Sequence, residues 1–172
     1  MKSVILTMVF YLFLLNASGQ DFSKFSTKYK PKTLDEAVLQ LDKLLHDTTK
    51  RNILSMTEGQ FGLSSHFGMG TWIRNNWRLW SGGKLSNYFK SIGIFHPDDM
   101  SGIILTSYYR HLKRQDRALE KQVQYYQEYW RTSKEHFDRL KADTAYKRMY
   151  QQKIQYTLDS LKKDDIKKSV NR

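Results

Sequence analysis

The spacing of apolar residues constrains this chain most, because it follows the period of a helix and not that of a strand. Side chains three and four positions apart share one face of a helix, whereas alternate residues share one face of a strand. Apolar residues recur at threes and fours from Leu34 to Leu45 and again from Met100 to Leu112. No stretch of useful length alternates apolar with polar residues. The pattern predicts an all-α fold with a compact multi-helix bundle.

Local signals mark three helix starts within this bundle. Thr33 and Thr57 are each followed three residues later by Glu or Gln, the spacing of a capping box in which two side chains satisfy backbone amides. His96 precedes Pro97, which suits the first helical position, and two carboxylates that favour the positive end of the helix dipole. Residues 61–80 are rich in Phe and Trp, whose large rings favour burial. We therefore expect the core to be centred on residues 61–80.

The sequence from Lys113 to the end contains neither Gly nor Pro, the two strongest helix breakers. Apolar residues keep a four-three spacing through its first half, at Leu119, Val123, Tyr126, Trp130, Phe137 and Leu140. Thr144 and Lys147 then occupy the same frame and interrupt the seam of a coiled coil. We expect residues 113–172 to form a long basic helical extension, as one helix or as two with a bend near Asp143. Its apolar face also offers a surface for self-association.

The amino terminus has the features of a secretory signal peptide. Lys2 precedes an uninterrupted apolar run from Val4 to Leu15, which is too short to cross a bilayer as a helix and fits the apolar region of a signal. Small residues at Ala17 and Gly19 suit recognition by a signal peptidase. We expect residues 1–19 to be removed after Gly19. The mature protein would be periplasmic or extracellular, with no transmembrane segment.

Composition excludes several classes of site. The chain has no cysteine, which excludes disulfides, thiol nucleophiles, Cys-ligated metals and a lipid anchor on an amino-terminal Cys. Its 29 Lys and Arg residues outnumber 17 Asp and Glu residues, which gives a formal charge of +12. Such a charge draws an exported protein toward anionic polymers, lipid head groups or acidic proteins, and it also favours solubility. Export argues against nucleic acid as the partner.

Two histidines and two aspartates are the candidates for acid–base chemistry: His66, His96, Asp98 and Asp99. Paired carboxylates can share a proton in a hydrolase, but adjacent helical residues point about 100° apart, so the simpler interpretation is that they complement the helix dipole. His96 can likewise cap the helix that Pro97 begins. No two histidines have the HExxH arrangement of a helical metal site, so we expect neither a metal nor another cofactor.

A second polar group lies among the tryptophans and is the candidate binding site: Arg74, Asn75, Asn76, Trp77 and Arg78. Arg74 and Arg78 would share one face of a helix, where with a ring they can bind an anionic or sugar-like ligand. In the alternative interpretation the tryptophans belong to the core and Arg74 is shielded from water. It would then pair with a carboxylate, for which Asp98 and Asp99 are the candidates.

Two stretches of this region resemble a bacterial family of small uncharacterised domains. They are HFGMGTWIRNNWRLW at His66–Trp80 and HPDDMSGIIL at His96–Leu105. The resemblance covers Thr33 to Leu112 and implies a shared helical domain over residues 33–112. It implies no activity and no site residue.

Together these features divide the chain into a signal, an extended lead-in at 20–32, the helical domain and the basic extension. The leading hypothesis is an exported, non-enzymatic binding or interaction module of the cell envelope, whose partner is an envelope protein or an anionic envelope polymer. The competing hypothesis is a hydrolase or lyase that acts on an envelope polymer. An enzyme needs its acid–base residues to meet in one open cleft, whereas a binding module needs only a surface patch.

Overall fold

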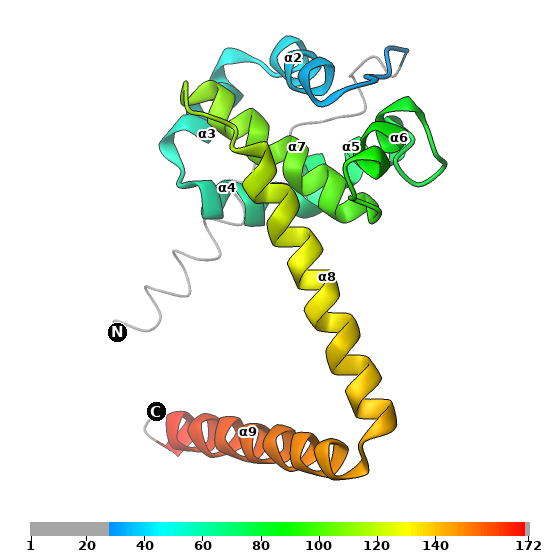
Figure 1. The fold of residues 1–172 in the computed structure, drawn as a ribbon. Helices are drawn as coiled ribbons and strands as arrows, with labels where there is room; N and C mark the ends of the chain where they lie inside the picture. The colour runs from blue at the N-terminus through cyan, green and yellow to red at the C-terminus, as the bar shows by residue number, and fades with distance from the viewer. Residues whose placement is uncertain (1–27, 171–172) are drawn as a thin grey trace. The chain divides into compact units, whose positions relative to one another are not determined.

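The computed structural model describes the backbone of residues 28–170 and the side chains of residues 28–163. The signal peptide predicted at 1–19, its cleavage site and residues 20–27 of the lead-in lie outside the described range. Residues 28–170 form helices joined by short turns and contain no β-strand (Figure 1). The prediction of an all-α fold is confirmed.

Short helices make up the first part of the chain and two long helices the last. The elements are α2 (Leu34–Leu44), α3 (Asp47–Ser55), α4 (Glu58–Ser65), η2 (His66–Gly70), α5 (Thr71–Asn76), α6 (Lys84–Ser91), α7 (Pro97–Leu112), α8 (Leu119–Ala142) and α9 (Thr144–Val170). They separate into two compact units, of which the first ends at Val123 and the second starts at Gln124, within α8.

Helix α7 forms the centre of the first unit. It contacts α2, α3, α4, η2, α5 and α6, and Figure 1 shows it in light green among them. Met100, Ile103, Ile104 and Tyr108 recur along it at threes and fours and are fully buried. A fully buried apolar side chain contributes roughly 1.5–3 kcal/mol, so this stripe is a main source of cohesion in the unit.

The aromatic segment 61–80 is only partly buried, which corrects the expectation that the core is centred on it. Phe61 and Trp77 are buried, but Phe67 is 80% exposed and Trp80 is 58% exposed. The helix changes its winding here, since η2 is a π-helix between two α-helical segments. A π-helical turn holds an extra residue and therefore shifts the side chains after it around the helix axis. The rings of this segment consequently do not share one buried stripe.

The predicted capping boxes differ in how they form. The box at Thr57 is complete, with reciprocal bonds to Gln60. At the start of α2 the Thr33 hydroxyl accepts the N–H of Glu36 at 3.3 Å, as expected. The Glu36 carboxylate, however, accepts the N–H of Lys32 at 2.9 Å. It therefore holds the lead-in residues before α2 and does not complete the box.

The second unit consists of α8 from Gln124 onward and α9. The two helices are separated at Asp143, whose carboxylate accepts the N–H of Tyr146 at 2.9 Å, so the arrangement with two helices is the observed one. None of the side chains described between residues 124 and 163 is buried. Ion pairs of Arg131 with Glu128 and Glu135 support α8 along its surface. Within the described part of the chain, every helix is too short or too polar to cross a membrane.

Candidate functional site

Arg74 is a buried hub that joins three elements of the first unit. Only 6% of its surface is exposed. Its Nε lies 3.0 Å from Asp98 Oδ1 on α7, and its Nη1 donates to Ser101 Oγ at 2.9 Å. Its Nη2 donates to Thr71 Oγ1 at 2.9 Å and to the carbonyl of His66 at 3.4 Å. The predicted pairing of Arg74 with Asp98 is confirmed.

The backbone beside this guanidinium is a glycine for a steric reason. A Cβ added to Gly70 would lie 3.0 Å from Arg74 Nη1 and 3.5 Å from Leu105 Cδ1. A larger residue at position 70 would therefore press on the buried arginine. Gly70 permits this close packing.

Asp98 connects the buried arginine to the start of α7. Its backbone N–H donates to His96 Nδ1 at 3.2 Å, and its Oδ2 lies 3.5 Å from the same ring nitrogen. Because that nitrogen accepts a hydrogen bond at the helix start, His96 caps α7, as one interpretation of the sequence expected. Trp80 packs edge-on against the His96 ring, with 5.9 Å between the centroids.

The fold also constrains the other two acid–base candidates, His66 and Asp99. The His66 ring packs edge-on against Phe67, with 4.7 Å between the centroids, and the residue meets Arg74 through its backbone carbonyl. Asp99 is 9% exposed on α7. Neither these two residues nor His96 and Asp98 line any of the pockets described below.

The five residues of the candidate binding group separate in the structure. Trp77 is 1% exposed and belongs to the core, whereas Asn75 is exposed. Asn76 donates to the carbonyl of Trp72 at 2.9 Å. The expectation that Arg78 shares a helix face with Arg74 is wrong, because α5 ends at Asn76 and Arg78 adopts a left-handed conformation with φ 59°.

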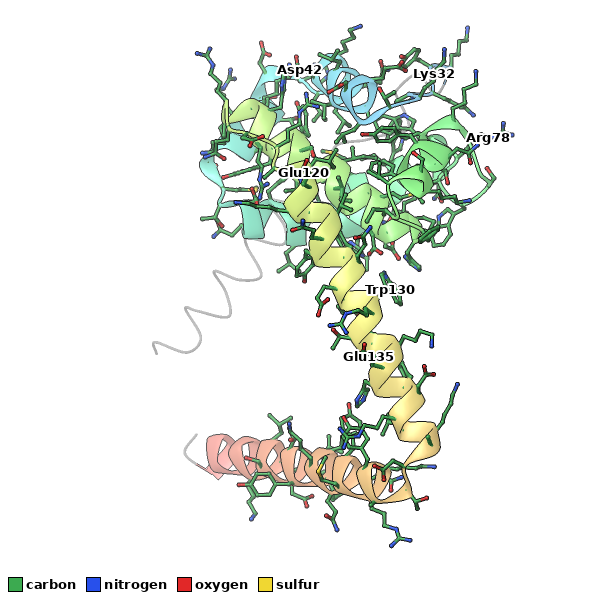
Figure 2. All side chains as sticks on the ribbon, in the orientation of Figure 1. Lys32, Asp42, Arg78, Glu120, Trp130 and Glu135 are labelled. Atoms are coloured by element: carbon green, nitrogen blue, oxygen red, sulfur yellow. The ribbon has the colours of Figure 1, made fainter. Side chains whose placement is uncertain are left out.

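Arg78 instead lines a pocket together with lysines from two other segments. We call it the cationic pocket, with a volume of about 360 Å³, and its lining residues are Lys30, Pro31, Lys32, Trp77, Arg78, Gly82, Gly83, Lys84 and Asn87. The four cationic side chains are exposed, and no acidic residue belongs to the lining. Figure 2 shows the labelled Lys32 and Arg78 on the same side of the first unit.

Glu36 holds the lead-in part of the pocket wall. Besides the N–H of Lys32, its carboxylate accepts the hydroxyl of Tyr29 at 2.8 Å. These two hydrogen bonds, and the nearby charges of Lys32 and Lys84, lower the pKa of Glu36. Pro31, between the two lysines of the lead-in, is buried. The lead-in is thereby tied to α2 with Lys30 and Lys32 at the pocket.

The other wall is a turn that two glycines shape. Gly82 has φ 80°, which a side chain would disfavour, and the N–H of Gly83 donates to the carbonyl of Arg78 at 3.1 Å. A Cβ on Gly83 would lie 3.3 Å from Arg78 Cβ. The glycines therefore let α6 begin close to Arg78, which brings Lys84 to the same pocket.

None of the four cationic side chains has an ion pair or a hydrogen bond with a residue between 28 and 163. Other cations of this unit do: Arg110 binds both carboxylate oxygens of Glu58 at 2.7 and 2.8 Å, and Arg117 pairs with Asp35. The cationic pocket is thus a place where four cations converge with no ion-pair partner among the side chains described at 28–163.

Sequence reasoning found Arg78 but missed the lysines of this pocket. The available signal was a pair of basic turns, Lys30-Pro31-Lys32 and Gly82-Gly83-Lys84. Each is an ordinary surface turn when considered alone. Their convergence depends on contacts between segments about fifty residues apart, which no local pattern encodes.

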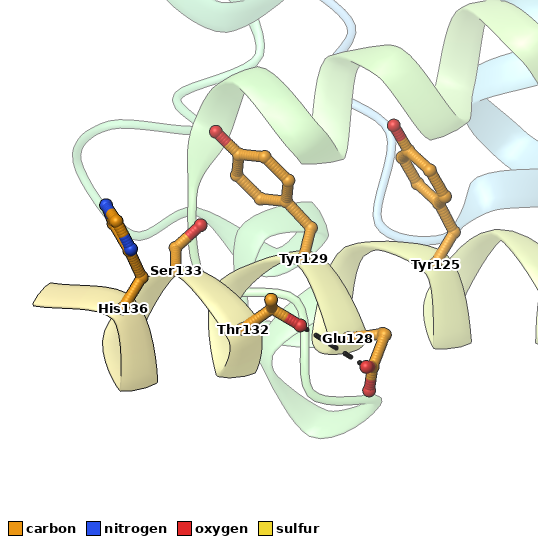
Figure 3. A pocket seen from close by; sticks show the side chains of 6 residues that line it. All are labelled: Tyr125, Glu128, Tyr129, Thr132, Ser133 and His136. Carbon is orange, nitrogen blue, oxygen red and sulfur yellow. Dashed lines mark hydrogen bonds between the residues drawn. The ribbon is translucent and has the colours of Figure 1, made fainter. Parts of the chain in front are cut away.

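A second pocket lies along one face of α8 in the second unit. It has a volume of about 490 Å³, and its lining residues are Tyr125, Glu128, Tyr129, Thr132, Ser133 and His136 (Figure 3). Thr132 donates to Glu128 at 3.3 Å, and His136 Nδ1 lies 3.0 Å from the hydroxyl of Tyr146 on α9. All six residues come from one helix, so this pocket is a shallow groove. A further pocket on α9 is lined by residues between Tyr150 and Leu158.

The side chains of residues 28–163 bring no three His, Asp or Glu together in a group that can hold a metal ion. Residues 30–112 match the family model described as Domain of unknown function (DUF6794). The match includes every residue that lines the cationic pocket. No curated protein and no solved structure matches the chain.

Proposed function

Residues 30–112 of this chain are a DUF6794 domain, and from the geometry of that domain we propose that the protein is an exported, non-enzymatic binding module of the cell envelope. The observation that carries the proposal is the ion pair between Arg74 and Asp98, at 3.0 Å. It gives one of the two candidate catalytic carboxylates a structural partner. His96 has a second structural task as the cap of α7.

A binding role needs an accessible surface instead of a reacting group, and the described residues supply one. The cationic pocket lies within the matched domain and carries four cations without an ion-pair partner among residues 28–163. A cluster of like charges attracts anionic partners over a distance set by ionic strength, about 8 Å at physiological salt. An anionic envelope polymer fits this surface better than an envelope protein with a neutral face.

The test separates retention of a polymer from its cleavage. The protein purified as its host makes it is immobilised and incubated with soluble fragments of anionic envelope polymer, and both retained polymer and newly formed chain ends are measured. We expect retention with no increase in chain ends. Retention that declines as chain ends accumulate would support the hydrolase or lyase.

His96→Asn is the matched variant for this assay, because Asn also caps helices but is neither a general acid nor a general base. We expect wild type and His96→Asn to retain polymer equally. Loss of chain-end formation in the variant alone would identify catalysis and reject the proposal.

The long helices provide a second surface, which we propose mediates association between two copies of the chain. Trp130 and Phe137 lie in the same four-three frame of α8 and are 47% and 60% exposed. No side chain described between residues 124 and 163 is buried, so much of the apolar surface of these rings faces solvent. A second copy of α8 can cover them through knobs-into-holes packing.

A further inference from the structure

Four cations line the cationic pocket, and a carboxylate of α2 lies near two of them, Lys32 and Lys84. That carboxylate, Glu36, already accepts hydrogen bonds from Lys32 N–H and the Tyr29 hydroxyl. Glu36 also feels the charges of Lys32 and Lys84, which lower its pKa. Four positive charges against one negative charge leave the pocket cationic, and like charges held close together repel. An anion that enters the pocket relieves this repulsion.

Neutral donors add to the charged ones. The first N–H groups of a helix have no intrahelical partner, and Gly83, which precedes α6, has no side chain to cap them. The Asn87 side chain lines the pocket one turn later and carries two amide donors. A Cβ at Gly82 would meet no atom within 4 Å, so the space above this part of the wall is open to a ligand.

A phosphoryl group matches this set of donors better than a carboxylate does. It carries up to two charges and presents several oxygens in a tetrahedral arrangement, so it can accept from Arg and from more than one Lys at once. A volume of about 360 Å³ corresponds to on the order of a dozen water molecules. The pocket therefore has room for more than a single phosphate.

The pocket wall favours a polymer over a membrane surface. Amphipathic helices bind membrane surfaces by inserting apolar side chains between the lipids. The two apolar residues of this wall, Pro31 and Trp77, are buried and have nothing to insert. We infer that the cationic pocket binds phosphoryl groups of an anionic, phosphate-containing polymer. The inference rests on the proposed binding function and specifies the chemistry of its ligand.

Calorimetric titration with sodium pyrophosphate at low ionic strength tests the site. The key variant is Arg78→Asn, because Asn tolerates the left-handed conformation at φ 59° and the change removes the guanidinium with its charge. The second variant is Lys84→Gln. Losing one charge-assisted hydrogen bond should weaken pyrophosphate binding about tenfold in each variant.

Lys90→Gln is the matched control, since Lys90 is exposed on the same helix as Lys84 and lies outside the pocket. We expect it to bind pyrophosphate like the wild type, and all variants to have wild-type melting curves. Absence of saturable binding, or equal weakening in Lys90→Gln, would overturn the inference.

Two further arms identify the source of the phosphate. Long-chain polyphosphate should bind with the same dependence on Arg78 and should compete with pyrophosphate. Vesicles of phosphatidylglycerol should bind weakly and independently of Arg78; Arg78-dependent vesicle binding that polyphosphate does not displace would assign the site to a membrane. If Arg78→Asn retains envelope polymer as well as the wild type does, the inference fails while the proposed binding function stands.

Discussion

Arg74 and Asp98 form one ion pair but differ in how far water reaches them. The Arg74 side chain is 8% exposed, whereas the Asp98 side chain is 37% exposed. Removing Asp98 would take this carboxylate from a buried guanidinium that also bonds the hydroxyls of Ser101 and Thr71 and the carbonyl of His66. Removing Arg74 would leave a carboxylate that water can still solvate. The two halves of the pair should therefore not be equally sensitive to substitution.

We expect Asp98→Asn to destabilise the protein more than Arg74→Met. An uncompensated buried charge costs roughly 3–5 kcal/mol. Arg74→Met keeps an unbranched stem and costs roughly 1–3 kcal/mol, because Ser101 and Thr71 lose a hydrogen-bond partner. Urea unfolding of the two variants gives the free energies of unfolding. Equal losses would show that packing around the Arg74 stem, and not its charge, dominates.

Glu36 makes a pH-dependent contribution to stability. Its pKa in the folded protein is lowered, first by the hydrogen bond from Lys32 N–H and next by that from the Tyr29 hydroxyl. A carboxyl whose pKa is lower in the folded state stabilises the fold above its unfolded-state pKa. We expect this contribution to be lost as the pH falls through the folded-state pKa of Glu36. A carbon-detected NMR titration of its side chain measures that midpoint.

The matched comparison for this titration is Glu36→Gln against Glu120→Gln. Glu120 is exposed on α8, so its substitution should leave the acid limb of the stability profile unchanged. Glu36→Gln should reduce the loss of folding free energy that occurs as the pH falls. A Glu36 midpoint at or above the ordinary value for glutamate would contradict the hydrogen-bonded geometry at the start of α2.

At the scale of the elements, α9 contributes little to the first unit, because it lies wholly in the second. We expect a chain that ends at Ala142 to melt within a few degrees of the full-length protein, since no buried side chain is removed between 143 and 163. Differential scanning calorimetry measures the shift. An insoluble or unfolded product would show that α9 completes the core.

A chain that ends at Leu112 is the contrasting truncation. It loses the ion pair between Arg117 and Asp35 and the hydrogen bond from Gln122 to Ser107 at 3.3 Å. It also loses the bond from Arg110 to the carbonyl of Arg117 at 2.7 Å. We expect a clearly larger fall in melting temperature than for the chain that ends at Ala142.

At the scale of the whole molecule, the two exposed rings of α8 predict self-association. Sedimentation velocity over a range of concentrations should show a dimer that Phe137→Lys dissociates, because a charge in the four-three frame opposes helix pairing. Tyr156→Lys is the control, since Tyr156 is 77% exposed on α9 and lies outside that frame. A monomer at all concentrations would contradict the proposal.

Export is the other property of the whole molecule that one measurement decides. Lys2, the apolar run from Val4 to Leu15 and the small residues before Gln20 predict cleavage after Gly19. Mass spectrometry of the protein from its host should give a mature chain that starts at Gln20. A mature chain that starts at Met1 would contradict the proposal of export. It would also contradict the envelope as the site of action.

Much of the architecture could be predicted from the sequence, because it depends on local and periodic features. The stripe on α2, the caps at Thr57 and His96 and the break at Asp143 each follow from residues within one or two helical turns. One interpretation of the sequence also paired Arg74 with a carboxylate at Asp98 or Asp99, since a cation among rings needs a carboxylate. The centring of the core was not, because the π-helical turn of η2 changed which rings face inward.

What the sequence determined by itself was therefore the helical class and most helix starts, and it narrowed the ion-pair partner of Arg74 to Asp98 or Asp99. Only the tertiary structure decided that Arg74 is bonded in the interior while Arg78 lies at the surface. There Arg78 lines one pocket with Lys30, Lys32 and Lys84. The physical reason is the range of the interactions. Periodicity and capping act within a few residues, whereas a pocket forms where packing against α7 brings the lead-in, the turn at Gly82 and the start of α6 together.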